Sequence, residues 1–124
     1  MLVKTSELNG VQLDWAVGEA QGLAVVASFG PLWRSEFAPS IRWAQAGPII
    51  EREGISLKYE ADPHQKWTAT WCKIEYKVVR HHTKIVKGPK VEMSASFGTP
   101  LIAAMRCYVA SKLGNEVEIP EELK

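Results

Sequence analysis

Four polar or aromatic side chains could together form a binding patch. Arg42, Trp43 and Gln45 lie within the sequence PSIRWAQAGPII, residues 39–50, and Asp14 precedes them on a predicted helix. Arginine and tryptophan are enriched at binding hot spots, and a helix that starts at the Gly-Pro pair would leave backbone N–H groups for an anion. The alternative, which we favour, is that Trp43 packs in the core, Gln45 binds neighbouring backbone and Arg42 lies in solvent.

A run of basic residues is the second candidate site. Between residues 73 and 90, the only acidic residue is Glu75. The six cations in this range are Lys73, Lys77, Arg80, Lys84, Lys87 and Lys90. On a protruding hairpin, with Trp71 and Tyr76 nearby, they could follow a phosphate backbone and stack a base. If all six met phosphates, log affinity would fall with log salt at a slope of about −5.

The alternative for the basic run is structural, and we favour it. An exposed hairpin can use lysines to keep its edge from pairing with other chains, and solvated charge runs are common. The charge of the whole chain does not decide between the two, because fifteen Lys and Arg against fourteen Asp and Glu give a formal net charge of +1.

The sequence contains no motif that indicates catalysis or metal binding. It lacks the Gly-x-Ser-x-Gly elbow and the phosphate loop. The histidines are His64, His81 and His82, and the two adjacent ones would point to opposite faces of a strand, so they could not easily share an ion. Cys107 lies among alanines and is expected to pack rather than react. We therefore expect no catalytic residue, metal or cofactor, and an enzyme with an unrecognised site is the weaker alternative.

Length and composition indicate a single domain, residues 1–124, in a reducing compartment. A chain of 124 residues can bury a core of its own without disulfides or a metal. With no signal peptide at residues 1–10, no long apolar run and only two cysteines, we expect free thiols, a cytoplasmic location and no membrane partner. The five tryptophans are expected to dominate the core.

The first part of the chain is predicted to form a helix and then a strand. Asn9 and Gln12 have the spacing of a capping box, and apolar residues then recur at helical spacing over residues 10–21. Asp14 is expected on the exposed side of this helix, where its charge suits the helix dipole. Residues 23–29, LAVVASF, are predicted to form a buried strand.

The stretch at residues 39–50 is predicted to contain a broken helix. Ser40 would cap a short turn, and Gly47 would end it in the left-handed conformation. Pro48 would begin a second short helix that ends at Gly54, with Ile49 and Ile50 anchoring it.

The second half of the chain is predicted to be two strands followed by a helix. Residues 67–79 and 91–97 alternate in polarity and are expected to pair, with a basic connector between them that is punctuated by Gly88–Pro89. Thr99 and Pro100 would begin the last helix, and Gly114 would end it. These elements predict an α+β fold, a mostly antiparallel sheet packed against terminal helices, with residues 115–124 as a peripheral acidic tail.

Three segments of the sequence together resemble the NinX-like family of small phage and prophage proteins. They are LDWAVGEAQG at 13–22, PSIRWAQAGPIIEREGISL at 39–57 and GTPLIAAMRCYVASKLGNEVEIPEEL at 98–123. The signature falls on Asp14, Trp15, Trp43, Ala44, Gln45, Gly47, Pro48, Thr99, Pro100, Ala104 and Met105. The chain departs from this pattern at Arg42, where an acidic residue is expected, and at Ala46, where glycine is expected.

The resemblance implies a domain of unknown function with no assigned active site. We therefore expect a small accessory protein of phage or prophage origin that acts in the bacterial cytoplasm. Its role would be non-catalytic, by binding another protein of the phage or its host. Nucleic-acid binding through the basic run at residues 73–90 is the alternative.

Overall fold

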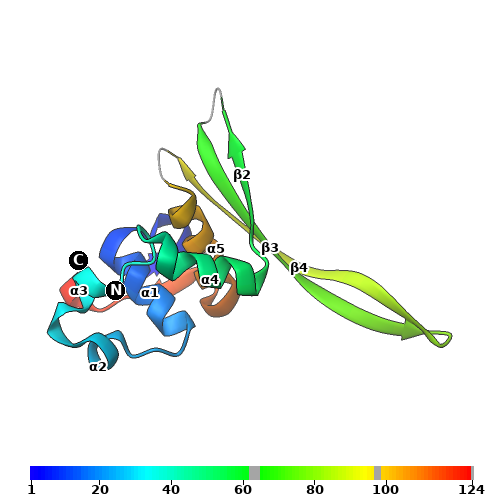
Figure 1. Ribbon diagram of the computed structural model, residues 1–124, viewed down its shortest axis with the longest axis horizontal. Helices are drawn as coiled ribbons and strands as arrows, with labels where there is room; N and C mark the ends of the chain where they lie inside the picture. Colours follow the sequence, from blue (N-terminus) through cyan, green and yellow to red (C-terminus); the bar gives the residue numbers. More distant parts are fainter. Residues whose placement is uncertain (62–64, 97–98, 124) are drawn as a thin grey trace.

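The computed structural model shows a helical body from which a long β-hairpin projects (Figure 1). It describes the backbone of residues 1–61, 65–96 and 99–123, with their side chains except at 73–77, 84–87, 89 and 96. The helices are α1 (Gly10–Ala20), α2 (Val25–Phe29), α3 (Trp33–Glu36), α4 (Trp43–Glu53) and α5 (Pro100–Leu113). The strands are β1 (Leu2–Lys4), β2 (Ser56–Glu60), β3 (Lys66–Val79), β4 (His82–Ser96) and β5 (Glu116–Glu118). The predicted α+β class is confirmed.

Helix α5 lies at the centre of the body. Eight of its residues are buried: Leu101, Ala103, Ala104, Met105, Cys107, Tyr108, Val109 and Ala110. It packs against α1, α4 and the β3–β4 hairpin, at the start of β3 and the end of β4. Small side chains allow this close approach on several sides at once. The predicted start and end are confirmed, since the Thr99 hydroxyl accepts a hydrogen bond from the Ile102 N–H at 3.4 Å and the helix stops before Gly114.

Helix α1 is confirmed, but its predicted capping box is wrong. Asn9 is the N-cap residue, yet its side chain makes no capping hydrogen bond. The Gln12 amide instead donates to the Leu123 carbonyl at 2.9 Å. A tertiary contact with the end of the chain has replaced the local one.

The predicted strand at residues 23–29 is wrong, because this segment forms the short helix α2. Of its two adjacent valines, Val25 is buried and Val26 is 61% exposed. The described residues of this region have no neighbouring strand with which to pair. A high β-propensity alone does not make a strand, since strands depend on a partner and on burial.

The predicted break at Gly47–Pro48 is also wrong, because α4 is continuous through it. Gly47 is not left-handed, and the helix ends at Gly54 as predicted, with a left-handed φ of 66° at this residue. Pro48 cannot donate to the carbonyl four residues earlier, that of Ala44. Ala44 is exposed, so water can serve its carbonyl group. The predicted anchor Ile49 is confirmed as buried.

The end of the chain is not a peripheral tail. Strand β5 pairs antiparallel with β1, in a register that places Val3 opposite Val117. Val117, Ile119 and Leu123 are buried in the core. The Met1 ammonium group also forms an ion pair with Glu118. Both ends of the chain therefore close one side of the body.

The tryptophans do not dominate the core. Trp33 is buried, whereas Trp15, Trp67 and Trp71 are partly buried against the core. Alanine and aliphatic residues of α1 and α5 supply most of the fully buried positions. Within the described residues, no helix has the length and the apolar character needed to cross a bilayer.

Two glycine substitutions test this packing and the continuity of α4. A Cβ atom at Gly18 in α1 would overlap the Val25 Cγ1 atom, and Val25 is buried, so Gly18→Ala should destabilise the protein by about 1–3 kcal/mol. A Cβ at Gly47 would meet nothing within 4 Å, so Gly47→Ala should stabilise it by about 0.5–1 kcal/mol. Urea unfolding followed by circular dichroism measures both. Destabilisation by Gly47→Ala would contradict the continuous helix.

Candidate functional site

Three of the four predicted patch residues meet at one loop, residues 37–42. On one side, the Asp14 carboxylate accepts a hydrogen bond from the Ser40 N–H at 2.8 Å. On the other, Gln45 accepts from the Ala38 N–H at 2.6 Å and donates to the Glu36 carbonyl at 2.6 Å. The expectation that Gln45 binds neighbouring backbone is confirmed.

The third of these residues, Arg42, is exposed but also binds backbone. Its guanidinium group donates to the Ser35 carbonyl at 2.8 Å. Asp14, Arg42 and Gln45 therefore all bind backbone groups within residues 35–40, at the end of α3 and in the loop that follows it. Their hydrogen-bonding atoms are directed at the protein's own chain.

Asp14 is buried, contrary to the expectation that it lies on the exposed side of α1. Asp14 is only 4% exposed, because the loop that contains Ser40 covers it. Burial raises the pKa of the Asp14 carboxyl group, and hydrogen bonds from the backbone and side chain of Ser40 oppose the shift. Asp14 is therefore not a solvent-exposed charge at the start of α1; it is a buried hydrogen-bond acceptor for the loop at residues 37–42.

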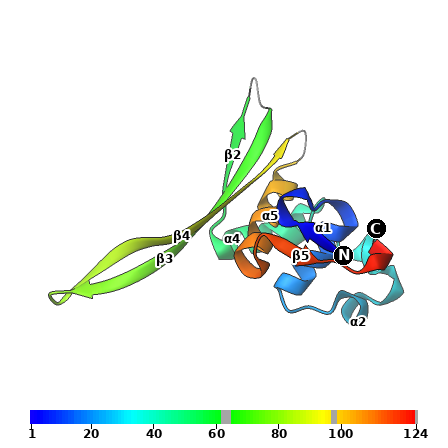
Figure 2. The same ribbon diagram turned by 180° about the vertical axis from the view of Figure 1, so that it is seen from behind.

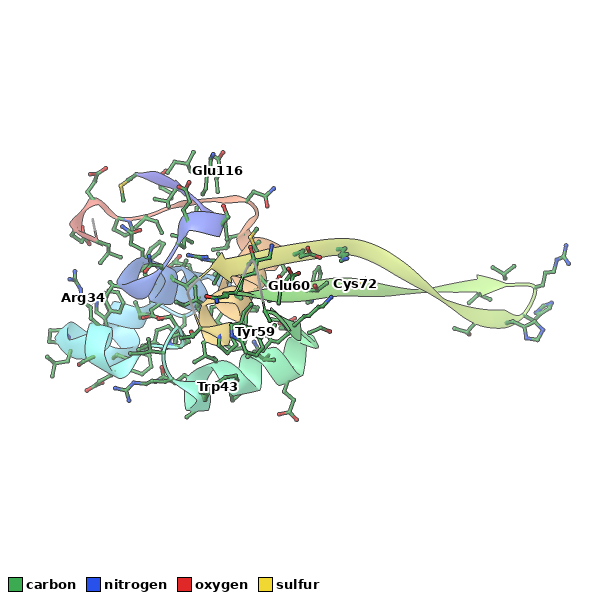
Figure 3. All side chains as sticks on the ribbon, turned by 90° about the horizontal axis from the view of Figure 1, so that it is seen from above. Arg34, Trp43, Tyr59, Glu60, Cys72 and Glu116 are labelled. Carbon is green, nitrogen blue, oxygen red and sulfur yellow. The ribbon has the colours of Figure 1, made fainter. Side chains whose placement is uncertain are left out.

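Trp43 is exposed, and the expectation that it packs in the core is wrong. It begins α4, and 57% of its surface is accessible, while Ala46 and Ile49 further along the helix are buried. Ile41, two residues earlier, is 71% exposed. Figure 3 shows Trp43 at the start of α4, on the side of the body that also carries α3. An indole and a branched aliphatic side chain therefore face solvent beside the loop.

The outer part of the hairpin, residues 74–87, projects away from the helical body, and we call it the arm (Figure 2). The prediction that the two strands pair is confirmed, but the predicted basic connector is wrong because β4 begins at His82 and runs through it. Val79 pairs with His82, so the loop consists of Arg80 and His81 alone. Gly88 and Pro89 lie within β4, next to a shift in register between Cys72 and Ile74.

The two loop residues at the end of the arm hold an unusual backbone conformation. Arg80 and His81 have φ values of 49° and 69°, in the left-handed region that favours glycine. Two such residues form the hairpin loop whose twist matches that of the strands. For side chains other than glycine each costs roughly 1–2 kcal/mol. The loop residues are exposed, as are their neighbours Val79 and His82.

Positive charge is concentrated on the arm and its inner end. Residues 73–90 contain six Lys or Arg and one Glu, a charge of +5, so the rest of the chain carries +1 minus +5, or −4. Directly paired positions 77 and 84 are both lysine. Arg80 and Lys90 are exposed; the side chains of Lys73, Lys77, Lys84 and Lys87 lie outside the described ones.

The inner half of the hairpin is fixed to α5. Ala69 and Ala95 are buried against the core, and the Cys107 thiol lies 3.6 Å from the Val91 carbonyl. Burial raises the pKa of Cys107 to about 12, so the thiol stays protonated at neutral pH. The expectation that Cys107 packs rather than reacts agrees with this environment.

Arg106 joins the hairpin to the first part of the chain, and sequence reasoning missed it. Its guanidinium group donates to the Leu8 carbonyl at 2.7 Å and to the Ser94 carbonyl at 2.9 Å. Burial lowers the pKa of Arg106. A single cation inside the apolar run PLIAAMRCYVA, residues 100–110, is the signal that could have revealed it.

Of the two aromatic side chains expected to stack a base, Trp71 is engaged in contacts with the body. Trp71 is partly buried in the hairpin, and the Lys112 ammonium group lies 5.9 Å from its ring centroid. Lys112 also lies 3.5 Å from the Glu53 carboxylate. Trp71 thus contributes to the junction of the hairpin with the body. The side chain of Tyr76, like His64, lies outside the described residues.

The described residues contain no group of three His, Cys, Asp or Glu that could hold a metal ion. In the same part of the chain, no pocket was found. His81 and His82 are exposed at the end of the arm. Cys72 and Cys107 do not form a disulfide.

Asp14 should make the free energy of unfolding depend on pH. Its pKa in the folded protein lies above the ordinary value of 3.8, so stability is full below that value and falls as pH rises through the raised pKa. Asp14→Asn should therefore stabilise the protein at pH 7 and remove this decline. Asp14→Ala, which leaves the Ser40 N–H without an acceptor, should cost about 1–3 kcal/mol. Urea unfolding of the wild type and of Asp14→Asn at a series of pH values tests this, and a stability difference between them that does not grow as pH rises would contradict it.

Trp43 should contribute little to folding. Because its side chain is largely exposed, Trp43→Ala should change the free energy of unfolding by less than about 0.5 kcal/mol. Trp33→Ala, at a buried tryptophan, is the matched comparison and should cost about 3–5 kcal/mol. Chemical unfolding monitored by far-ultraviolet circular dichroism distinguishes them, and equal losses would show that Trp43 packs in the core.

Comparison with known proteins identifies the family. No curated protein matches the chain. The family model described as bacteriophage P22, NinX, matches residues 4–112. This range includes the arm, which the three resembling segments do not reach, and it confirms the resemblance that those segments indicate. The chain is a phage-derived protein that belongs to the bacteriophage P22 NinX family.

Proposed function

We propose that the protein binds nucleic acid through the arm and the adjoining hairpin, residues 73–90, and that the helical body is the base that holds this hairpin. The observation that carries the proposal is the separation of charge along a projecting element. The hairpin segment has a charge of +5 and the rest of the chain −4. The arm projects from the body (Figure 1), and Arg80 at its end is exposed, while Lys90 at the inner end is exposed and lies 3.4 Å from the Glu92 carboxylate.

The length of the arm suits a groove of a nucleic acid helix. Ile74–Val79 of β3 pairs with residues 82–87 of β4. At about 3.3 Å per residue these strands reach roughly 20 Å beyond the bulge near Cys72. Two-stranded ribbons of this kind bind nucleic acid in either groove of the duplex.

The negative charge of the body supports an orientation. Phosphates would be repelled by the body and attracted to the hairpin, so the arm would meet the nucleic acid first. The hydrogen bonds and packing that join Arg106, Cys107 and Lys112 to the hairpin then keep its inner end fixed. Binding of this kind is non-catalytic and fits an accessory protein in the cytoplasm of the bacterial host.

A second candidate function is binding to another protein of the phage or the host. Ile41 and Trp43 are largely exposed on either side of Arg42, and tryptophan and arginine are enriched at hot spots of protein interfaces. Trp43→Ala, expected to fold normally, is the variant that tests it. A protein captured from infected cells by the wild type but not by this variant would support a partner at this surface. Equal capture would contradict it.

Removal of two arm charges should weaken nucleic-acid binding and reduce its salt dependence. Lys77→Gln with Lys84→Gln removes both members of one directly paired position. If both contact phosphates, the slope of log affinity against log salt should become smaller in magnitude by about 2. Electrophoretic mobility and fluorescence anisotropy of labelled DNA and RNA across a salt series measure this.

The matched control removes two charges from the body. Lys4 and Arg34 are exposed there, and Lys4→Gln with Arg34→Gln lowers the total charge by the same amount. This control variant should have the same salt slope as the wild type, and its affinity should be equal or slightly lower. Absence of a salt-sensitive shift for the wild type, or equal effects of the two double variants, would overturn the proposal.

A further inference from the structure

We propose that the end of the arm is an apolar wedge, Val78 and Val79, that enters the minor groove of duplex DNA between base steps and bends the duplex. This inference rests on the proposed nucleic-acid binding and names its substrate as double-stranded DNA. It concerns the last residues of the strands, whereas the proposed function concerns the charges along them.

The two valines are exposed to a degree that folding does not explain. Val78 is 77% exposed and Val79 is 51% exposed. Consecutive residues of a strand point to opposite faces, so the apolar surface lies on both sides of the ribbon. Thr83 and His82 are their cross-strand partners, and among the described residues no further strand lies beside either one at this end. An exposed edge is ordinarily protected by charged residues rather than by valine.

The end of the arm is narrow, because it consists of two paired strands and a two-residue loop. The loop contains only Arg80 and His81, both left-handed, so the two strands stay paired up to the turn. Paired strands lie about 4.8 Å apart before side chains are added. The minor groove of B-form DNA is roughly 6 Å wide and admits such a ribbon only if it opens. Apolar side chains inserted between base steps provide that opening, because they separate stacked bases and kink the duplex by about 20–90°.

The charges next to the valines match the same groove. Arg80 and His81 are exposed at the extreme end, and Lys77 and Lys84 occupy the third paired position from the loop, next to Val78 and Thr83. A narrow minor groove concentrates negative potential and attracts inserted arginine. The minor groove of an RNA helix is wide and shallow, so a wedge gains little there. These properties favour DNA over RNA.

A charge-complementary second copy is the main competing occupant. The arm of one molecule carries positive charge and the body of another carries negative charge, with Ile41 and Trp43 exposed on it. The apolar faces at the end of the arm would then be covered by protein. This alternative predicts self-association at low salt without DNA, which light scattering after size-exclusion chromatography detects.

The experiment measures binding and bending together. A duplex of about 30 base pairs carries a donor and an acceptor dye at its two ends, and the full-length protein is added at low salt. The wild type should bind, as shown by anisotropy, and should raise energy transfer because the ends approach each other. A single strand and an RNA duplex of the same sequence should bind more weakly.

The decisive variant is Val78→Thr with Val79→Thr, which keeps the shape and β-propensity of both residues. It should lose less than about tenfold in affinity, because the phosphate-binding charges remain, with an unchanged salt slope. It should also lose most of the rise in energy transfer. Val26→Thr, at a similarly exposed valine on the body, is the matched control and should behave as the wild type.

Three results would overturn the wedge while leaving nucleic-acid binding in place: binding without bending by the wild type, equal bending by the double threonine variant, or a preference for RNA or single strands. Absence of any binding would overturn the proposed function as well. Self-association that the Val78→Thr, Val79→Thr variant abolishes, without DNA binding by the wild type, would assign the valines to a protein interface instead.

Discussion

The structure depends on the burial of α5 on nearly every side. Its alanines and Cys107 allow α1, α4 and the inner half of the hairpin to approach one helix, and bulkier residues at these positions would hold them apart. Each of these elements contacts α5 more than it contacts the others, apart from the strands among themselves. A helix that is surrounded in this way fixes the relative positions of segments that are far apart in the sequence.

The two candidate surfaces have different relations to this core. Around the loop at residues 37–42, Asp14 and Gln45 direct their hydrogen-bonding atoms at backbone, and only Ile41 and Trp43 are left for a partner. The described side chains of the arm, residues 78–83, are all exposed and none belongs to the core cluster, which the hairpin reaches outside the arm at Trp71 and Val91. Side chains that do not support the fold are free to serve a ligand, and this difference is why the arm carries the proposed function.

The elements with strong local patterns could be predicted from the sequence. Thr99, Pro100 and Gly114 delimit α5 because capping and proline act within a few residues. The alternation in residues 67–79 likewise predicts β3, since that period is a property of every strand. The register of the hairpin could not be predicted, because Gly88–Pro89 looks like a turn, whereas it lies within β4 at a shift in register and the strands pair on both sides of it.

The sequence predicts which residues belong to the candidate sites but not how they are arranged. Asp14, Arg42 and Gln45 do bind the same stretch of backbone, but the sequence does not show that loop 37–42 covers the Asp14 carboxylate. The sequence predicts Trp43 in the core because tryptophan is usually buried, but Trp43 is the first residue of α4, and the buried side of that helix consists of Ala46 and Ile49. Val26 shows the converse limit: a β-branched run without a partner strand became a helix. Tertiary context decides these cases.

The two ends of the chain lie beside each other, on the side of the body opposite the arm (Figures 1 and 2). The Met1 carbonyl accepts a hydrogen bond from the Ile119 N–H at 2.7 Å, so β1 and the residues after β5 form one seam. A molecule tethered to a sensor surface through either terminus would present the arm outward, unobstructed by its own attachment. The same adjacency makes the protein suitable for circular permutation, with a short linker closing the seam and new ends opened elsewhere on the body.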